Sequence, residues 1–165
     1  MALRKTHRRA FTLVEILVVV TIIGMIGAIV VPHVLQAGTM QVQAAGRIVI
    51  ADILFAQNDA VAQQRTRRVV FEPSLNRYRL TDIDGNLLTA TWMPGQQYEQ
   101  DFNADKRFTG VRIQNVDFNG GLILEYDELG TPSTGGSLDL VAAGKTYRVT
   151  VAPFTGRVTI DVVGE

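Results

Sequence analysis

Apolar residues dominate the chain from Phe11 to Val31, and this run differs from everything that follows it. Between Ile16 and Val31 only Thr21 and three small residues interrupt the bulky apolar side chains. A helix needs about 20 apolar residues to span about 30 Å of hydrocarbon. The pattern therefore predicts a transmembrane helix over residues 11–33.

Beyond this run, apolar residues recur at spacings of three and four, which is the period of a helix with one buried face. The predicted buried stripe consists of Val42, Ala45, Val49, Ile53, Ala56 and Ala60, widened by Ala44, Ile48, Ala51 and Phe55. We predict one continuous helix to about residue 64, about 80 Å long at about 1.5 Å per residue. Pro32 removes a backbone donor and is expected to bend the helix.

After Arg65 the period changes from helical to alternating, which is typical of strands with one core face. Strands are predicted over residues 68–71, 77–80, 87–92, 111–118, 122–126, 137–141, 145–151 and 157–163. Asn119-Gly120-Gly121 predicts a hairpin between the fourth and fifth of them, and residues 95–108 read as an exposed loop. The fold class is thus α+β, with residues 34–165 forming one domain in which the helix covers one sheet of an antiparallel β-sandwich.

Charge is distributed unevenly along the 165 residues, although the net charge is zero. The first ten residues hold four Lys or Arg and no acid, which leaves a net charge of −4 on the remainder. Positive flanking charge holds the N-terminus in the cytoplasm, so the C-terminal domain is expected to lie across the inner membrane, in the periplasm. The chain has no cysteine, which excludes disulfides and Cys-ligated metals.

One carboxylate, Glu15, stands near the start of the apolar run, where an unpaired charge is costly and invites a functional explanation. Phe11, Thr12, Leu13 and Glu15 follow a short basic leader, and Pro32 lies 21 residues after Phe11. This pattern resembles the leader of type IV pilins and type II secretion pseudopilins. One position departs from that pattern, because Ala10 stands where the family has Gly before the cut.

The resemblance implies a leader over residues 1–10, cleavage between Ala10 and Phe11, and N-methylation of Phe11. It implies a prepilin peptidase and methyltransferase as partner, with lipid and other pilins or pseudopilins around the helix. We expect Glu15 to pair with the N-terminal amine of a neighbouring subunit, because a carboxylate in lipid costs several kcal/mol unless it is paired. Glu15 and Pro32 are therefore the predicted assembly residues.

Three other interpretations of the N-terminus stay open. A simple membrane anchor explains the length of the apolar run but leaves Glu15 without a role. A secretory signal cut after Ala44 explains export, but its apolar core is normally about 7–15 residues long. Glu15 also has a structural alternative, in which its side chain extends to the membrane interface instead of pairing.

The helix running through residues 52–62 and followed directly by the strand Arg68-Val69-Val70-Phe71 resembles the minor pseudopilin H family. The closing segments 147–151 and 155–160, with a Gly-Arg-Val turn, are similar to the C-terminal hairpin of that family and of FimT-type minor pilins. The resemblance implies a structural minor pseudopilin of a type II secretion system. The alternatives are a minor pilin of a type IV pilus, used for adhesion, motility or DNA uptake, and a membrane-anchored binding module that does not polymerise.

Catalytic chemistry finds little support in the sequence. His7 and His33 are the only histidines, so the external domain has none to act as a base near neutral pH. We therefore expect no enzyme, no cofactor and no metal site. Asp82 and Asp84 resemble the start of a calcium loop but also form an ordinary turn sequence.

A cluster of arginines is the remaining candidate for binding in the external domain. Its members are Arg65, Arg67, Arg68, Arg77 and Arg79. They could form a basic patch or a solvated sheet face, and nucleic acid is not the expected partner because the C-terminal residues are acidic.

Overall fold

The computed structural model describes residues 11–89, 95 and 97–164, with the backbone alone for residues 27 and 29–38. The predicted leader, including Ala10, lies outside the described residues, as do residues 90–92 of the strand predicted over 87–92. From that strand, Leu87 and Thr89 form only isolated bridges. The chain divides into two compact units, Met1–Gln36 and Ala37–Glu165.

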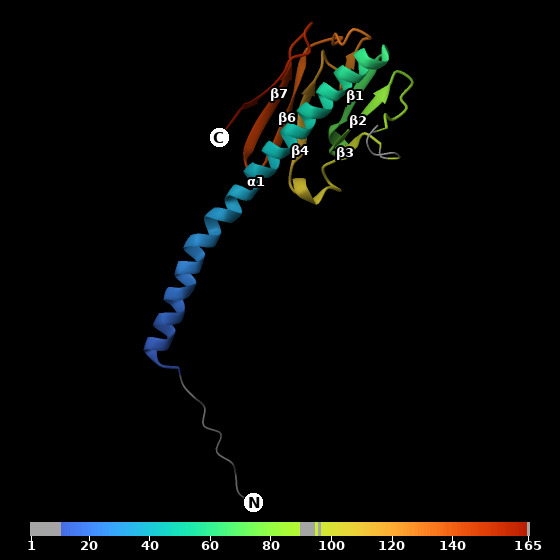
Figure 1. Cartoon of the computed structure of the whole chain (residues 1–165). Helices are drawn as coiled ribbons and strands as arrows, with labels where there is room; N and C mark the ends of the chain where they lie inside the picture. Colours follow the sequence, from blue (N-terminus) through green and yellow to red (C-terminus); the bar gives the residue numbers. More distant parts are fainter. Residues whose placement is uncertain (1–10, 90–94, 96, 165) are drawn as a thin grey trace, which may run out of the picture. The chain divides into compact units, whose positions relative to one another are not determined.

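One long helix and eight strands make up the described regular structure, together with two short 3₁₀ turns (Figure 1). Helix α1 spans Leu13–Gln63 and passes from the first unit into the second. The first sheet has the order β3-β2-β1-β5, and the second has the order β4-β6-β7-β8. The strands are β1 Arg67–Glu72, β2 Arg77–Asp82, β3 Glu99–Asp101, β4 Arg112–Asp117, β5 Ile123–Tyr126, β6 Gly136–Ala142, β7 Lys145–Val151 and β8 Val158–Val162.

Every strand pair within the two sheets is antiparallel, which confirms the predicted α+β class. The predicted stripe on the helix is confirmed as well, since Val42, Ala45, Val49, Ile53, Ala56 and Ala60 are all fully buried. Ile48 and Phe55 pack at its margin, whereas the prediction was wrong for Ala44 and Ala51, which are exposed. The buried stripe is narrower than expected because the two alanines lie too far round the helix to reach the sheets.

The helix contacts both sheets, so the prediction that it covers only one was wrong. Near its entry into the domain, Gln43 donates a hydrogen bond of 2.8 Å to the Tyr147 hydroxyl on β7. Close to its end, Asp59 forms an ion pair of 2.5 Å with Arg67 on β1. A single core therefore joins the helix and both sheets.

Residues 95–108 were wrongly predicted to be an exposed loop. This segment contains β3 and the 3₁₀ turn Lys106–Phe108, and it buries Phe102 and Phe108. Their rings contact each other edge to face at 5.5 Å between centroids. The two aromatic residues are six positions apart within polar sequence, so they leave no helical or strand period to detect.

The hairpin predicted around Asn119-Gly120-Gly121 is only half correct. The turn forms, and Phe118 and Gly121 exchange two backbone hydrogen bonds across it. Beyond this single bridge the strands separate, because β4 pairs with β6 in one sheet and β5 pairs with β1 in the other. The segment therefore connects the two sheets.

One side chain of α1 holds two loops of the domain. The Gln57 amide donates to the carbonyl oxygen of Gly130 at 2.8 Å and to that of Thr155 at 3.2 Å. Gly156 follows in a left-handed conformation, with φ of +65°. A Cβ atom at Gly156 would lie 2.5 Å from the Gln57 nitrogen, so the turn after β7 packs directly on the helix.

Asp52 is the acidic group that α1 directs toward the core, where the Tyr78 hydroxyl donates to it at 2.5 Å. Burial raises the pKa of Asp52 above its ordinary value of 3.8, and the hydrogen bond from Tyr78 acts in the opposite direction. Burial and the nearby carboxylate hold the pKa of Tyr78 well above 10, so the hydroxyl stays a donor. The pair satisfies two polar groups within the core.

We expect Tyr78→Phe to lower the free energy of unfolding by about 1–3 kcal/mol at pH 7, because it leaves a buried carboxylate without its donor. The raised pKa of Asp52 means that the folded state loses stability as the pH rises from 3.8 through that pKa. The cost of Tyr78→Phe should therefore be smaller below pH 3.8, where the carboxyl is protonated. Urea unfolding of the parent chain and of Tyr78→Phe, at pH 7 and below pH 3.8, measures this cost.

Asp52→Asn serves as the matched control, since its amide oxygen still accepts from Tyr78 and no longer ionises. Its stability should lack the fall that begins at pH 3.8. An equal cost of Tyr78→Phe at both pH values would contradict a role for the ionised carboxylate.

Candidate functional site

The N-terminal end of α1 carries the predicted processing and assembly residues, and its start has a local cause. The Glu15 amide donates to the Thr12 hydroxyl at 3.2 Å, and the Ile16 amide donates to the Thr12 carbonyl at 3.2 Å. Thr12 is therefore the N-cap, and Thr12-Leu13-Val14-Glu15 has the Thr-x-x-Glu spacing of a capping box. This capping role was not predicted from the sequence, although the Thr-x-x-Glu spacing is visible in it.

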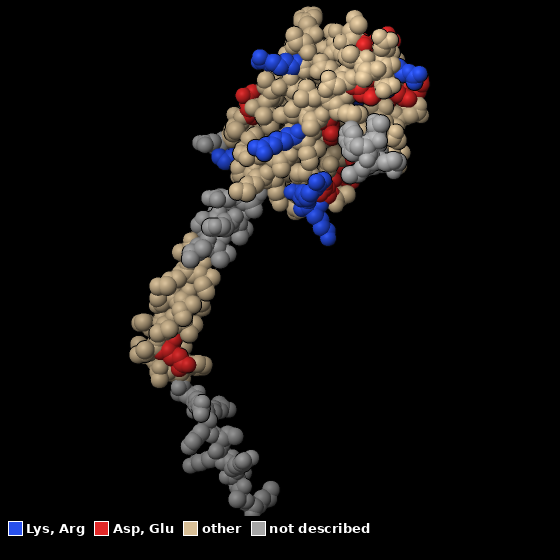
Figure 2. All heavy atoms as spheres, in the orientation of Figure 1, with Lys and Arg blue, Asp and Glu red and all other residues tan. Residues whose placement is uncertain are grey.

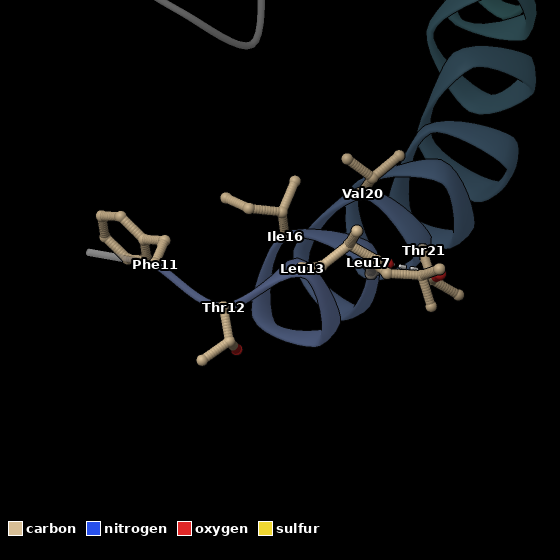
Figure 3. A pocket seen from close by; sticks show the side chains of 7 residues that line it. All are labelled: Phe11, Thr12, Leu13, Ile16, Leu17, Val20 and Thr21. Carbon is tan, nitrogen blue, oxygen red and sulfur yellow. Dashed lines mark hydrogen bonds between the residues drawn. The ribbon is translucent and has the colours of Figure 1, made fainter.

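Large apolar side chains surround this end of the helix without covering one another. Phe11 is 74% exposed, and every described large apolar side chain from Leu13 to Ile26 is exposed as well. Figure 3 shows Phe11, Ile16 and Val20 pointing outward from the first turns, with Leu13, Leu17, Thr12 and Thr21 beside them. Exposed apolar surface on this scale marks a segment that is covered by lipid or by another protein. Among the described residues, no helix reaches the length and mean hydropathy of a membrane span.

Glu15 is the only acid between Phe11 and Ala51. In Figure 2, acidic atoms appear near the N-terminal end of the helix among residues other than Lys, Arg, Asp and Glu. The Glu15 side chain is exposed, and no base in the described part of the chain lies within ion-pair distance of it. Its charge is thus available to a group outside the described chain.

Of two other predicted site residues, Ala10 and Pro32, the structure describes at most the backbone. Ala10 lies outside the described residues, next to Phe11 in sequence. The backbone of α1 is helical through Pro32, so the helix continues past it, and the bend expected there stays a prediction.

Asp82 and Asp84 form a turn. One Asp82 oxygen accepts from the amides of Asp84 and Asn86, at 3.0 and 2.8 Å, and the other accepts from the Asn86 side chain at 2.9 Å. These hydrogen bonds, led by the one from the Asn86 side chain, lower the pKa of Asp82. Across residues 11–89, 95 and 97–164, no three His, Cys, Asp or Glu side chains are grouped as a metal site would require.

Four of the five arginines in the cluster pair with carboxylates, and none of the ion pairs among the described residues includes Arg65. Arg67 pairs with Asp59, Arg68 with Glu125 at 2.6 Å, and both Arg77 and Arg79 with Glu72, at 2.5 and 2.9 Å. On the face of the domain in Figure 2, acidic and basic side chains are interspersed. The four paired arginines therefore belong to a charged sheet face, in which acids compensate the positive charge that would otherwise attract phosphates.

Comparison with known proteins finds matches both to the N-terminal segment and to the fold of the domain. Residues 5–31 match the prokaryotic N-terminal methylation motif. No curated protein matches the chain in sequence. The solved structures it resembles include the minor pseudopilin EpsH from the Type 2 Secretion System of Vibrio cholerae, with 13% identity and a TM-score of 0.56 over 76% of this chain and 99% of that chain.

A second similar structure is the type IV minor pilin FimU of Pseudomonas aeruginosa. The identity is 14% and the TM-score 0.54, over 74% of this chain and 90% of that chain. Another crystal form of FimU gives a TM-score of 0.50 at 14% identity, over 72% and 91% of the two chains. The chain therefore has a pilin-like fold behind an N-terminal methylation motif, as the resemblance predicts.

Proposed function

We propose that this protein is a structural minor pseudopilin of a type II secretion system, which assembles into a filament based in the inner membrane. The observation that carries the proposal is the joint occurrence of a methylation motif at residues 5–31 and a domain with the fold of a minor pseudopilin. The likeness covers 76% of this chain and 99% of the solved EpsH chain.

The residues of the N-terminal segment take distinct roles in this proposal. A prepilin peptidase cuts between Ala10 and Phe11, and Phe11 is then N-methylated. Residues 11–33 lie in the inner membrane, where the apolar side chains described as exposed, from Phe11 to Ile26, contact lipid or neighbouring helices. Glu15 pairs with the amine of a neighbour, because an unpaired carboxylate is costly in hydrocarbon.

A minor pilin of a type IV pilus is the second candidate, supported by the likeness to FimU over 90% of that chain. The two functions use the same processing and the same fold, and differ in the machine that the filament serves. Deletion of the gene in the native host separates them. Loss of enzyme secretion with intact pilus functions supports the first candidate, and the reverse supports the second.

Processing is the most direct test of the proposal. We expect the membrane form to begin at Phe11 and to carry one methyl group on its α-amine. Intact-mass analysis and N-terminal sequencing of the protein from native membranes measure both. A mature N-terminus at Ala45 would show an ordinary secretory signal instead, and an uncut chain would show a simple anchor.

A further inference from the structure

Four strands form the edges of the two sheets, and three of them are protected against pairing with other chains. β3 has three residues, all of them polar or acidic. β4 contains a bulge between Gln114 and Asp117, where Asn115 has φ of +47°. β5 is covered by the segment that returns along it, through a hydrogen bond from the Ser133 amide to the Glu125 carbonyl. Short length, bulges and covering segments are the usual protections of an edge strand.

β8 has none of these protections among the described residues. Its five residues, Val158 to Val162, pair with β7 in one unbroken register and include no proline. Four of them are β-branched, which favours the extended conformation. No other described strand pairs with the second edge of β8.

The register shows which backbone groups face outward. The Val163 amide donates to Thr146, and the Ala152 amide donates to Arg157, so the odd-numbered residues 157–163 are those that bond to β7. In an antiparallel pair the alternate residues direct their N–H and C=O groups away from the partner strand. Val158, Ile160 and Val162 therefore present their amide donors and carbonyl acceptors at the open edge.

Side chains at this edge are only partly covered. Val158 and Ile160 pack against the core, and Ile160 lies over Gly46 of α1, where an added Cβ atom would clash with the Ile160 Cδ1. Val162 continues the same row and is 56% exposed. An added strand with apolar side chains on this face would extend the buried row.

Charge indicates which side chain a further strand, added at the open edge of β8, should carry on the face that points away from the core. Asp161 lies opposite Arg148 of β7. Arg148 donates to Asp139 instead, at 2.7 and 2.9 Å, and this bond lowers the pKa of Asp139, which is only 2% exposed. In the described part of the chain no base lies within ion-pair distance of Asp161. A Lys or Arg on the added strand would supply the missing charge.

We propose that the open edge of β8 is a strand-addition site for an extended segment of another protein, with apolar residues facing the Val158–Val162 row and a Lys or Arg opposite Asp161. Strand addition of this kind obtains affinity from main-chain hydrogen bonds and specificity from alternate side chains.

A second copy of this chain is not the occupant, because its own β8, Val158–Val162, contains no Lys or Arg to place opposite Asp161.

The test uses the full-length chain in detergent micelles and, as probe, a capped peptide with the sequence of residues 157–163. Amide hydrogen exchange measured by NMR should show Val158, Ile160 and Val162 exchanging at least about ten-fold faster than Thr159 and Asp161 in the free chain. Excess peptide should slow the three outward amides by at least about ten-fold. Paired antiparallel about Ile160, the peptide places its Thr159 opposite Asp161. A Thr159→Lys peptide should thus bind more tightly, and a Thr159→Glu peptide more weakly.

Val162→Pro in the chain removes an outward N–H that β7 does not use, so it should abolish peptide protection and leave exchange within β7 unchanged. Val162→Thr, which keeps the N–H and the β-branch, should bind the peptide like the parent chain. The proposal is overturned by outward amides that are already protected, by a peptide without effect, or by binding that survives Val162→Pro. Concentration-dependent protection without peptide would identify a second copy as occupant and overturn it too. None of these readouts depends on processing at Phe11, so failure of the proposed function is detected separately.

Discussion

Glu15→Leu is expected to remove the protein from its filament while leaving membrane insertion and leader cleavage intact. Insertion survives because losing a charge makes the segment more apolar. Cleavage survives because the bond between Ala10 and Phe11 is recognised through its flanking residues. Assembly fails because the amine of the neighbouring subunit loses its counter-charge in a medium of low dielectric constant. Breaking such a buried pair costs about 3–5 kcal/mol, or more than about 100-fold in association.

Co-purification of the crosslinked protein with its neighbouring subunits measures this loss. Val14→Leu is the matched control, because it changes an exposed apolar side chain beside Glu15 and should assemble normally. Glu15→Gln keeps the shape and some hydrogen bonding without the charge, and it should show an intermediate loss. Glu15→Leu protein recovered with its partners at the parent level would disprove the charge-pair role, and extension of Glu15 to the membrane interface would then be the better account.

Gly156→Ala is expected to destabilise the domain by about 2–4 kcal/mol, combining a left-handed backbone cost of about 1 kcal/mol with overpacking of about 1–3 kcal/mol. The second contribution arises because the new Cβ would lie 2.5 Å from the Gln57 nitrogen and 3.0 Å from the Tyr126 ring. Displacing Gln57 also releases its hydrogen bonds to the two loops. Urea unfolding of the full-length chain measures the total.

Gly144→Ala isolates the backbone contribution. Gly144 has φ of +75°, close to that of Gly156, but apart from its two chain neighbours no described residue has a heavy atom within 4 Å of the position that a Cβ atom would take there. The substitution should therefore cost only about 1 kcal/mol. Equal costs for the two variants would show that Gln57 moves without penalty and does not hold the loops in place.

Helices and strands with a regular period were predictable from the sequence, because the residues that share one face of such an element lie at fixed spacings. The buried stripe from Val42 to Ala60 follows the helical period, and β7 follows the alternation of Tyr147, Val149 and Val151. The end of the helix follows from the change of period near Arg65. In each case a local pattern determines which face is apolar.

Features that depend on contacts between distant segments were not predictable in this way. β3 has only three residues, and it exists because β2 supplies its partner. The separation of β4 from β5 depends on which partner each strand finds after the turn at Gly120. Arg68 pairs with Glu125, which lies 57 positions away in the sequence. The sequence alone therefore did not show which acid pairs with this arginine.

At the candidate site, the sequence singled out Glu15 as a lone carboxylate in an apolar run and Phe11 through a resemblance, and it left Thr12 without a role. The hydrogen bond from Glu15 to Thr12 shows that the two residues also determine where the helix begins. Glu15 thus contributes its backbone to the cap, while its side chain stays available to a neighbour. A substitution of Glu15 retains the backbone amide and should leave this start unchanged.

The position of this cap has a consequence for the proposed cleavage. In a helix that begins at Leu13, the first hydrogen bond runs from the Ile16 amide to the Thr12 carbonyl, so Phe11 precedes the helical hydrogen bonds. Proteases act on backbone that is free of such bonds, and the proposed cut before Phe11 lies on the N-terminal side of the cap. The proposed processing therefore requires no unfolding of the described helix.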